Sequence, residues 1–431
     1  MTSTTHADPR STVSQPATDR SDGSLLLVIP SVLDAADGEV RLDEHFANNL
    51  AAYLEHFRQV TVACPSQPQG VNSVALSRLS GAERCRIVVL PTPYREDRYL
   101  WLRGRVSRLL TEEIERADYL LISPHAAFDW STRAAQLAVK LGRDFDMEAD
   151  AHLQDIMRSL CAGMPNGPNK LRKYLWLHLH SRAYLGVLSR SSVALLQGAT
   201  VFDAYRNVAP NPHKVLNVQI TDADRIDAAA LEAKACAVLA GAPLRIVYTG
   251  RAIDIKGPFE WIGALALLQR SGTRFHADWY GDGNLLPQMR EAVVASGLSG
   301  EITLHGNVER SRSIAALREA HICLFCHQTE ESPRCLLEAI ASGAALVGYA
   351  SRYAQDLVES GGGLFTRRSD VGALAETLHR LDADRERLAD LMRSALRSSL
   401  RYDRHSAIGE RIALIKRFVR PPSPPRPTAN A

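Results

Sequence analysis

The sequence predicts an α/β protein of two domains, each built on a doubly wound parallel sheet. Short apolar runs alternate with amphipathic helical stretches along most of the chain, which is the pattern of parallel β-α units. The chain has 431 residues, close to three times a typical domain of about 150 residues. A polar, alanine-rich stretch interrupts the pattern near its middle. We therefore expect a first domain over residues 24–220, a linker over 221–242 and a second domain over 243–400.

The first half opens on Ser24–Pro30, a continuous apolar run that is typical of a strand buried on both faces. The segments that continue the pattern are a helix at 45–57, strands at 59–64 and 86–93, a helix at 101–114, a strand at 118–124, a helix at 131–141, the run 143–152, a helix at 170–188 and a strand at 193–198.

The second half repeats the alternation from Pro243 onward. We expect strands at 244–250, 275–281, 302–306 and 322–326, and helices at 261–270, 286–296, 313–320 and 335–342. In sheets of this kind, ligands bind beyond the carboxyl ends of the strands, and a pair of domains adds a cleft between them.

Composition excludes several classes of protein. Lysine and arginine number 51 against 48 acidic residues, a formal charge of +3, which disfavours electrostatic binding of nucleic acid as the main role. The first 23 residues lack the apolar core of a secretory signal, and no apolar run reaches the ~18 residues of a spanning helix. Seven cysteines, an odd number, favour reduced thiols. We expect a cytoplasmic protein with disordered tails at 1–23 and 421–431.

Two cations follow a buried strand in the second half. The strand ends at Gly250, and Arg251 and Lys256 lie in the loop before the next helix. Arginine holds phosphate oxygens through its planar fork and lysine acts as a point charge, so this pair suits a diphosphate. The loop alone leaves open that both are ordinary solvated cations.

Two glutamates follow the apolar strand at 322–326. Glu330 falls in the loop after this strand, and Glu338 falls about one turn into the next helix, with seven residues between them. A carboxylate inside an apolar helix needs hydrogen-bond donors, and sugar hydroxyls are suitable donors. The amides at the start of that helix favour a phosphate. The alternative is a capping Glu330 and a solvent-facing Glu338.

In their order along the chain, these features resemble the retaining family 4 glycosyltransferases of the GT-B fold. The resemblance covers about residues 243–390, and the first half matches only in rhythm. The matching segments are Gly250-Arg251, Lys256-Gly257, Gly281-Asp282-Gly283, Gly306-Asn307-Val308, and Glu330 with Glu338.

The resemblance implies two Rossmann-like domains facing across a cleft, with a last helix at 401–420 that crosses back to the first domain. It implies a hexosyltransferase that uses a UDP- or GDP-linked sugar, needs no metal, and acts on a glycan or lipid-linked glycan in cell-surface polysaccharide biosynthesis. Arg251 and Lys256 would hold the diphosphate, Glu330 would contact the donor sugar, and Glu338 would bind the ribose.

The resemblance also implies further contacts to the donor. The remaining donor-binding residues would be Gly250, Asp282, Asn307 and Val308, the last two against the base. A first-domain histidine is expected near the donor sugar; His152 is our first choice and His125 the second, and an ordinary loop histidine is an equally good interpretation of either.

The chain departs from the family in three places. Before the second domain it has Leu216–Thr221 (LNVQIT) where the family usually has asparagine-glycine. After the first strand it has Gly38 where the family often has a glycine pair. After the first glutamate it has Glu331-Ser332-Pro333-Arg334 where the family commonly has phenylalanine-glycine.

Other interpretations stay open from sequence. A nucleotide-sugar epimerase or phosphorylase, or a non-catalytic nucleotide-binding or scaffold protein, would share the architecture. The basic, Trp-containing stretches 94–108 and 170–184 would suit an anionic membrane surface, or would be solvated helices. Cys323 and Cys326 are flanked by histidines and lie in an apolar strand. Because consecutive side chains of a strand point to opposite faces, these four residues cannot easily converge on a zinc ion, and core thiols are favoured.

Overall fold

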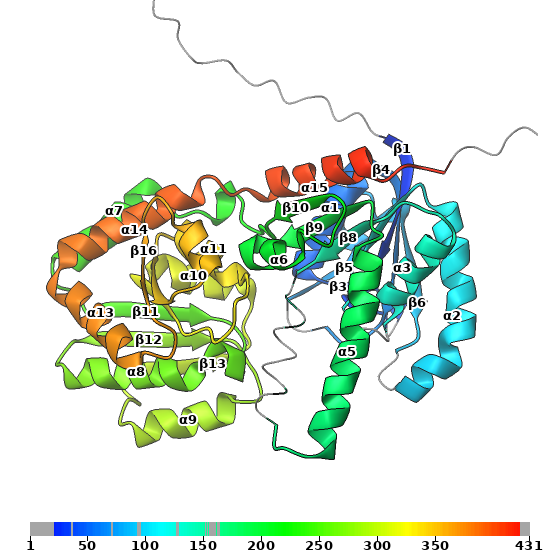
Figure 1. The fold of residues 1–431 in the computed structure, drawn as a ribbon. Helices are drawn as coiled ribbons and strands as arrows, with labels where there is room; N and C mark the ends of the chain where they lie inside the picture. The colour runs from blue at the N-terminus through cyan, green and yellow to red at the C-terminus, as the bar shows by residue number, and fades with distance from the viewer. Residues whose placement is uncertain are drawn as a thin grey trace, which may run out of the picture.

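The computed structural model describes residues 21–35, 38–69, 72–92, 96–125, 129–150, 152, 154, 161 and 164–422. Figure 1 shows two α/β domains side by side, with helix α15 (Arg404–Phe418) crossing from the second domain onto the first. Most of the expected tails lie outside the described residues. Residues 21–23 differ from the expectation, because strand β1 begins at Ser21.

The first domain holds a parallel sheet of seven strands with the expected doubly wound order. Its strands, in spatial order, are β10 (Pro212–Val215), β9 (Val193–Gln197), β8 (Asp146–Ala149), β7 (Tyr119–Ile122), β1 (Ser21–Val28), β4 (Phe57–Pro65) and β6 (Cys85–Leu90). The strand order reverses at β1, whose residues Leu25 to Val28 are fully buried because helices cover both faces of the sheet.

Five helices and a small antiparallel sheet complete the described part of the first domain. The helices are α1 (Glu44–His56), α2 (Glu96–Arg116), α3 (Trp130–Lys140), α5 (Pro168–Leu188) and α6 (Gly198–Tyr205). The small sheet pairs β2 (Leu33–Asp34), β3 (Arg41–Asp43) and β5 (Ser73–Ala75), and short 3-10 turns follow at Leu76–Arg78 and Ala82–Arg84.

The second domain repeats the architecture with a parallel sheet of six strands. In spatial order they are β13 (Ile302–Gly306), β12 (Phe275–Tyr280), β11 (Leu244–Thr249), β14 (Ile322–Phe325), β15 (Ala345–Tyr349) and β16 (Gly363–Thr366). Its helices are α7 (Ala228–Leu239), α8 (Pro258–Arg270), α9 (Leu286–Ala295), α10 (Arg310–Glu319), α11 (Arg334–Ala341), α12 (Arg352–Leu357), α13 (Val371–Ala383) and α14 (Arg385–Ser399). The strand order reverses between β11 and β14, so the loops after these two strands open onto one crevice.

The segment expected as a linker, 221–242, contains helix α7 and the 3-10 turn η4 (Asp222–Asp224). Leu231 and Val238 of α7 belong to the core of the second domain, as do Val218 and Ile220 just before η4. The structure therefore extends the packed second domain toward the N-terminus. The sequence analysis did not identify this helix because most of its residues are alanine or polar, and few are large apolar side chains.

Helix α15 packs on the first domain, as the resemblance implied. Ile408, Ile412 and Ile415 share one core with β1, β4 and α1. Arg411 of this helix is buried, and it binds Glu148 and Gln197 at the carboxyl ends of β8 and β9. None of the helices in the described parts of the chain is long and apolar enough to span a membrane.

Candidate active site

A cavity of about 970 Å³ lies between the domains, beyond the carboxyl ends of both sheets. Every second-domain residue predicted from the sequence lines it: Gly250, Arg251, Lys256, Asp282, Asn307, Val308, Glu330 and Glu338. The first domain contributes residues from the start of α1 and from the ends of β8 and β9. The parallel sheet brings the scattered motifs together because successive strands end at one edge.

Lys256 is held in a tight turn at this edge. It is 8% exposed, and its Nζ lies 2.7 Å from Glu331 Oε2. The next residue, Gly257, has a φ of 62°, and a Cβ there would lie 2.1 Å from the carbonyl oxygen of Cys326. Only glycine fits this turn, so there is a steric reason for glycine to follow Lys256 in the sequence. Glu331, which the sequence analysis noted only as a departure, is the partner of the predicted phosphate-binding lysine.

Glu338 lies in a buried ion-pair network at the other side of the cavity. Its Oε1 accepts a hydrogen bond from Arg310 Nε at 3.0 Å, and Arg310 Nη1 donates to Asp224 Oδ1 at 3.0 Å. Burial raises the pKa of Glu338, and the charge of Arg310 opposes that shift. Among the described residues none donates to Oε2 of Glu338, so this oxygen can accept a ligand hydroxyl.

Glu330 is fixed by donors from both domains. Its Oε2 accepts from Thr200 Oγ1 of the first domain at 3.4 Å and from the Arg352 amide at 3.2 Å. Its Oε1 accepts from Arg368 Nη2 at 2.9 Å. A carboxylate accepts about four hydrogen bonds, so Glu330 retains room for one more donor.

Helices α1 and α11 both begin at the cavity, and they differ in their capacity for an anion. The first turn of α1 is capped by the Asp43 side chain, which accepts from the amides of His45 and Phe46. Helix α11 begins after Pro333 with no side-chain cap. Because unpaired amides and the helix dipole favour an anion, the uncapped start of α11 can accept one, whereas the Asp43 carboxylate already occupies the equivalent position on α1.

Arg251 and Arg334 supply the uncompensated positive charge. Both line the cavity, and neither has an acidic partner within hydrogen-bonding distance in the part of the chain that the structure describes. By contrast, Lys256 is paired with Glu331, and Arg310 with Glu338. The first turn of α11 therefore carries a free guanidinium beside its uncapped amides.

The two histidines proposed from the sequence lie outside the residues that line the cavity. His152 packs edge-on against Tyr205 with ring centroids 5.6 Å apart, and His125 Nε2 lies 3.7 Å from Asp150 Oδ1. Asp150 itself lines the cavity, as does another histidine, His45. Burial, together with nearby arginines, lowers the pKa of His45 to about 3, so its ring is neutral at pH 7.

Asn72 connects the domains across the cavity wall. Its side chain donates to the Val308 carbonyl at 3.2 Å and accepts from the Arg310 amide at 2.8 Å. The sequence analysis did not find Asn72, His45, Arg310 or Arg334. Arg310 and Arg334 had a usable signal, since each begins a helix just after a strand-end loop, whereas Asn72 and His45 carry no local signal of contact with the other domain.

Comparisons with known proteins agree with this architecture. Residues 231–397 match the family model of glycosyl transferases group 1. No curated protein sequence matches the chain. Among solved structures, HepE of Anabaena in complex with UDP and glucose is similar, with a TM-score of 0.65, 15% identity and coverage of 91% of this chain and 98% of that one.

Two further structures have comparable similarity. Sucrose-phosphate synthase of Thermosynechococcus elongatus has a TM-score of 0.65 at 15% identity, covering 91% of this chain and 98% of that one. WaaG, a glycosyltransferase involved in lipopolysaccharide biosynthesis, has a TM-score of 0.64 at 12% identity, covering 91% and 99%. The group 1 match over the second domain, together with the GT-B fold of the whole chain, makes this protein a glycosyltransferase.

Proposed function

We propose that this enzyme transfers a hexose from a nucleotide diphosphate sugar to a hydroxyl of a glycan or lipid-linked glycan, with retention of the anomeric configuration, as family 4 enzymes do. One observation carries the proposal: a single interdomain cavity gathers Arg251, Lys256, Glu330 and Glu338 around the uncapped start of α11. The UDP and glucose bound to HepE support a nucleotide-sugar donor for this chain as well.

The donor diphosphate would lie at the start of α11, between its amides and the side chains of Arg251 and Lys256. Positive groups placed where charge develops on the leaving diphosphate stabilise the transition state. No divalent cation is needed in this arrangement, because the cations and the helix end supply that charge. Lys256 would have to share its ammonium between Glu331 and the phosphate.

The two glutamates would recognise hydroxyls. Glu338 Oε2 would accept from the ribose, and Arg310 would keep the carboxylate in place. Glu330 would accept from a hydroxyl of the donor sugar. Because Thr200 of the first domain also binds Glu330, the sugar contact would be sensitive to closure of the domains. The backbone at Asn307 and Val308 would pack against the base, with Asn72 fixing the loop.

The acceptor would bind on the first domain, where two helices carry exposed apolar side chains. Trp101 of α2 is 83% exposed, and Leu171 and Leu175 of α5 are 73% and 63% exposed. Arginines accompany them on α2, and lysines and arginines on α5. Figure 1 shows the N-terminal part of α5 extending below the sheet. We propose that these helices contact an anionic membrane that holds a lipid-linked acceptor, which would place the enzyme in cell-surface polysaccharide biosynthesis.

Donor binding can be tested with a thermal-shift panel of UDP- and GDP-linked hexoses. A ligand at about 100 times its Kd stabilises the folded state by ~2.7 kcal/mol. With the best donor, transfer to a glycan acceptor is followed by NMR of the product's anomeric proton, and inversion would contradict the retaining assignment. Lys256→Met should lower transfer by about 10²–10³-fold, as loss of a transition-state donor does. Lys140→Met, on the exposed face of α3, is the matched control.

The pairing of Lys256 with Glu331 favours one alternative, a protein that binds a nucleotide sugar without transferring it. In that case nucleotide sugars would still raise the melting temperature, but no product would form with any acceptor. The Lys256→Met variant would give the same two results as the wild type. Membrane contact is tested separately by flotation with anionic vesicles at low salt. Equal recovery of the wild type and a Trp101→Ser, Leu175→Ser variant would count against it.

A further inference from the structure

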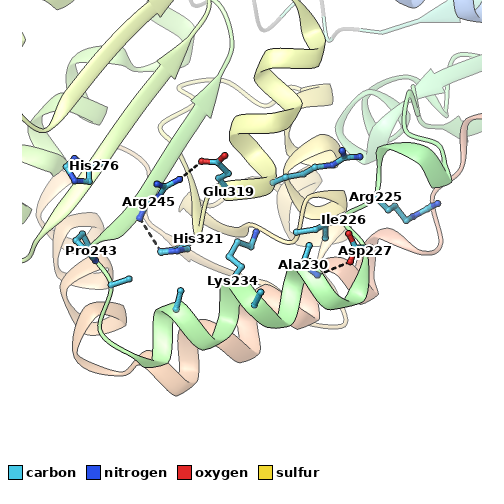
Figure 2. Close-up of a pocket in the computed structure, with 14 residues that line it drawn as sticks. Arg225, Ile226, Asp227, Ala230, Lys234, Pro243, Arg245, His276, Glu319 and His321 are labelled. Atoms are coloured by element: carbon cyan, nitrogen blue, oxygen red, sulfur yellow. Dashed lines mark hydrogen bonds and ion pairs between the residues drawn. The ribbon is translucent and has the colours of Figure 1, made fainter.

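A second cavity of about 890 Å³ lies on the second domain, at the opposite end of its sheet from the donor cavity. It is bounded by α7, by the starts of β11 and β12, and by the end of α10. Figure 2 shows α7 along one side, with the side chain of Lys234 reaching from it toward His321. Alanines of α7 and Pro243 give this side an apolar surface.

The cavity is rich in cations from several elements. The charged and titratable groups that line it are Arg225 and Asp227 before α7, Lys234 on α7, Arg245 on β11, His276 on β12, Arg318 and Glu319 on α10, and His321 before β14. Arg385 of α14 lies near enough for its charge to lower the pKa of His321. The lining therefore contains four Lys or Arg side chains and two carboxylates.

Two of the four cations lack an acidic partner in the described residues. Lys234 is 9% exposed, and its Nζ donates only to backbone carbonyls, those of Ala320 at 2.8 Å and Ser342 at 2.9 Å. Arg318 donates to the carbonyl of Ala223 at 2.7 Å. Arg225 and Arg245 are paired with Asp222 and Glu319. A largely buried ammonium without a counter-ion is unfavourable unless an anion joins it.

We propose that this cavity binds a small dianion that carries a phosphate or sulfate group, with Lys234 and Arg318 as its main cationic contacts. The exposed alanine face of α7 would cover a short apolar portion of the ligand. This site is separate from the donor cavity, and it does not depend on which donor or acceptor the enzyme uses.

Occupancy would be transmitted to the donor cavity through α11. Lys234 binds the carbonyl of Ser342, the C-cap of α11, and the amide of Ile226 binds the Ala341 carbonyl at 2.9 Å. The same helix carries Glu338 and begins at the donor cavity. In addition, Asp224, next to Arg225 in the cavity wall, binds the Arg310 that holds Glu338. An anion that repositions Lys234 therefore acts on the C-terminal end of the helix whose N-terminal end and Glu338 line the donor cavity.

Proton linkage gives the site a specific signature. Burial lowers the pKa of Lys234 to about 7, so its amine is partly neutral at pH 7. A bound anion favours the charged form, and binding should therefore weaken as pH rises above about 7 and level off below it. His321, whose pKa burial lowers to about 4, stays neutral over the range concerned.

The test is calorimetric titration of the full chain with sulfate, a dianion at both about pH 6 and about pH 8.5, in the presence of saturating UDP to occupy the donor cavity. Affinity should be about ten-fold or more higher at the lower pH, because only the protonated lysine binds the dianion well. Ala237→Leu places bulk in the cavity without touching the Lys234 bonds, and it should abolish binding. Ala229→Leu, exposed on α7 but outside the lining, should not.

The remaining arms separate the parts of the proposal. In the His276→Gln variant, sulfate affinity should still depend on pH as in the wild type. If this variant lost the pH dependence, the assignment to Lys234 would be overturned. At pH 7, phenyl phosphate should bind more tightly than sulfate if the alanine face takes part; equal affinity would remove that role. Sulfate should change UDP affinity in the wild type and not in Ala237→Leu. Undetectable sulfate binding, or equal binding in the two alanine variants, would overturn the site even if transferase activity is found.

Discussion

Replacing Glu331 with glutamine should strengthen UDP binding, although the residue lines the donor cavity. The Glu331 carboxylate lies 2.7 Å from Lys256 Nζ, with side-chain exposures of 26% and 10%. A diphosphate bound to the same ammonium would sit on the order of 6 Å from the carboxylate. Two unit charges at that separation repel by about 0.7 kcal/mol in water and ~2.8 kcal/mol at an effective dielectric constant of 20.

The diphosphate of UDP carries at least two charges, so the repulsion is at least about 1.4 kcal/mol in water and ~5.5 kcal/mol at an effective dielectric constant of 20. The partial exposure of Glu331 places the expected value near the lower limit, which corresponds to about ten-fold in Kd. Calorimetric titration with UDP measures it directly. Asp254→Asn removes a carboxylate two residues from Lys256 that is exposed and outside the lining, and should leave Kd within about two-fold at moderate salt. Weaker UDP binding by Glu331→Gln would refute the reasoning, because Glu331 would then be needed to orient Lys256.

Three more outcomes follow from other contacts. Arg334→Gln removes a guanidinium without an acidic partner among the described residues, and UDP binding should weaken by about ten-fold or more, since a charge-assisted bond contributes ~1.5–3 kcal/mol; unchanged calorimetric Kd would contradict this. Gly257→Ala would place Cβ 2.1 Å from the Cys326 carbonyl and should lower the free energy of unfolding by at least ~1–3 kcal/mol, measured by urea denaturation. Burial raises the pKa of Asp146 well above its ordinary value, and neither oxygen has a hydrogen-bond partner among the residues that the structure describes. The folded state therefore holds this proton above the unfolded pKa of ~3.9, and its stability falls as pH rises from there. Asp146→Asn should gain in Tm relative to wild type between pH 4 and pH 8; parallel Tm profiles would contradict it.

The sequence predicted the strands well because burial on both faces gives continuous apolar runs. The run at Ser24–Pro30 became β1, and the runs at 244–250 and 322–326 became β11 and β14. It also predicted the second-domain side of the cavity, since residues just beyond parallel strands share an edge of the sheet. The linker expectation failed to anticipate α7, because an alanine-rich helix with few large apolar residues resembles a polar connector.

Pairing between distant residues could not be predicted in the same way. The contacts of Lys256 with Glu331, and of Arg310 with Asp224 and Glu338, join positions whose separation in the chain carries no periodic signal. The same is true of Asn72, which reaches the other domain. Such contacts depend on how strands and domains are ordered in space, and one sequence records that order only indirectly.

The loop from Glu331 to Arg334, which departs from the family pattern, places one negative and one positive side chain at the donor cavity. Six carboxylates and four Arg or Lys side chains line the donor cavity among the described residues, so its overall field does not favour a diphosphate. Affinity must instead come from local placement. Glu331 neutralises Lys256, and Arg334, three residues later, adds a guanidinium at the uncapped start of α11. Because these two changes act in opposite directions on the same ligand, the variant Glu331→Gln, Arg334→Gln should bind UDP with nearly wild-type affinity, while each single change shifts it. A double variant as weak as Arg334→Gln alone would mean that the two side chains do not act on a common anion.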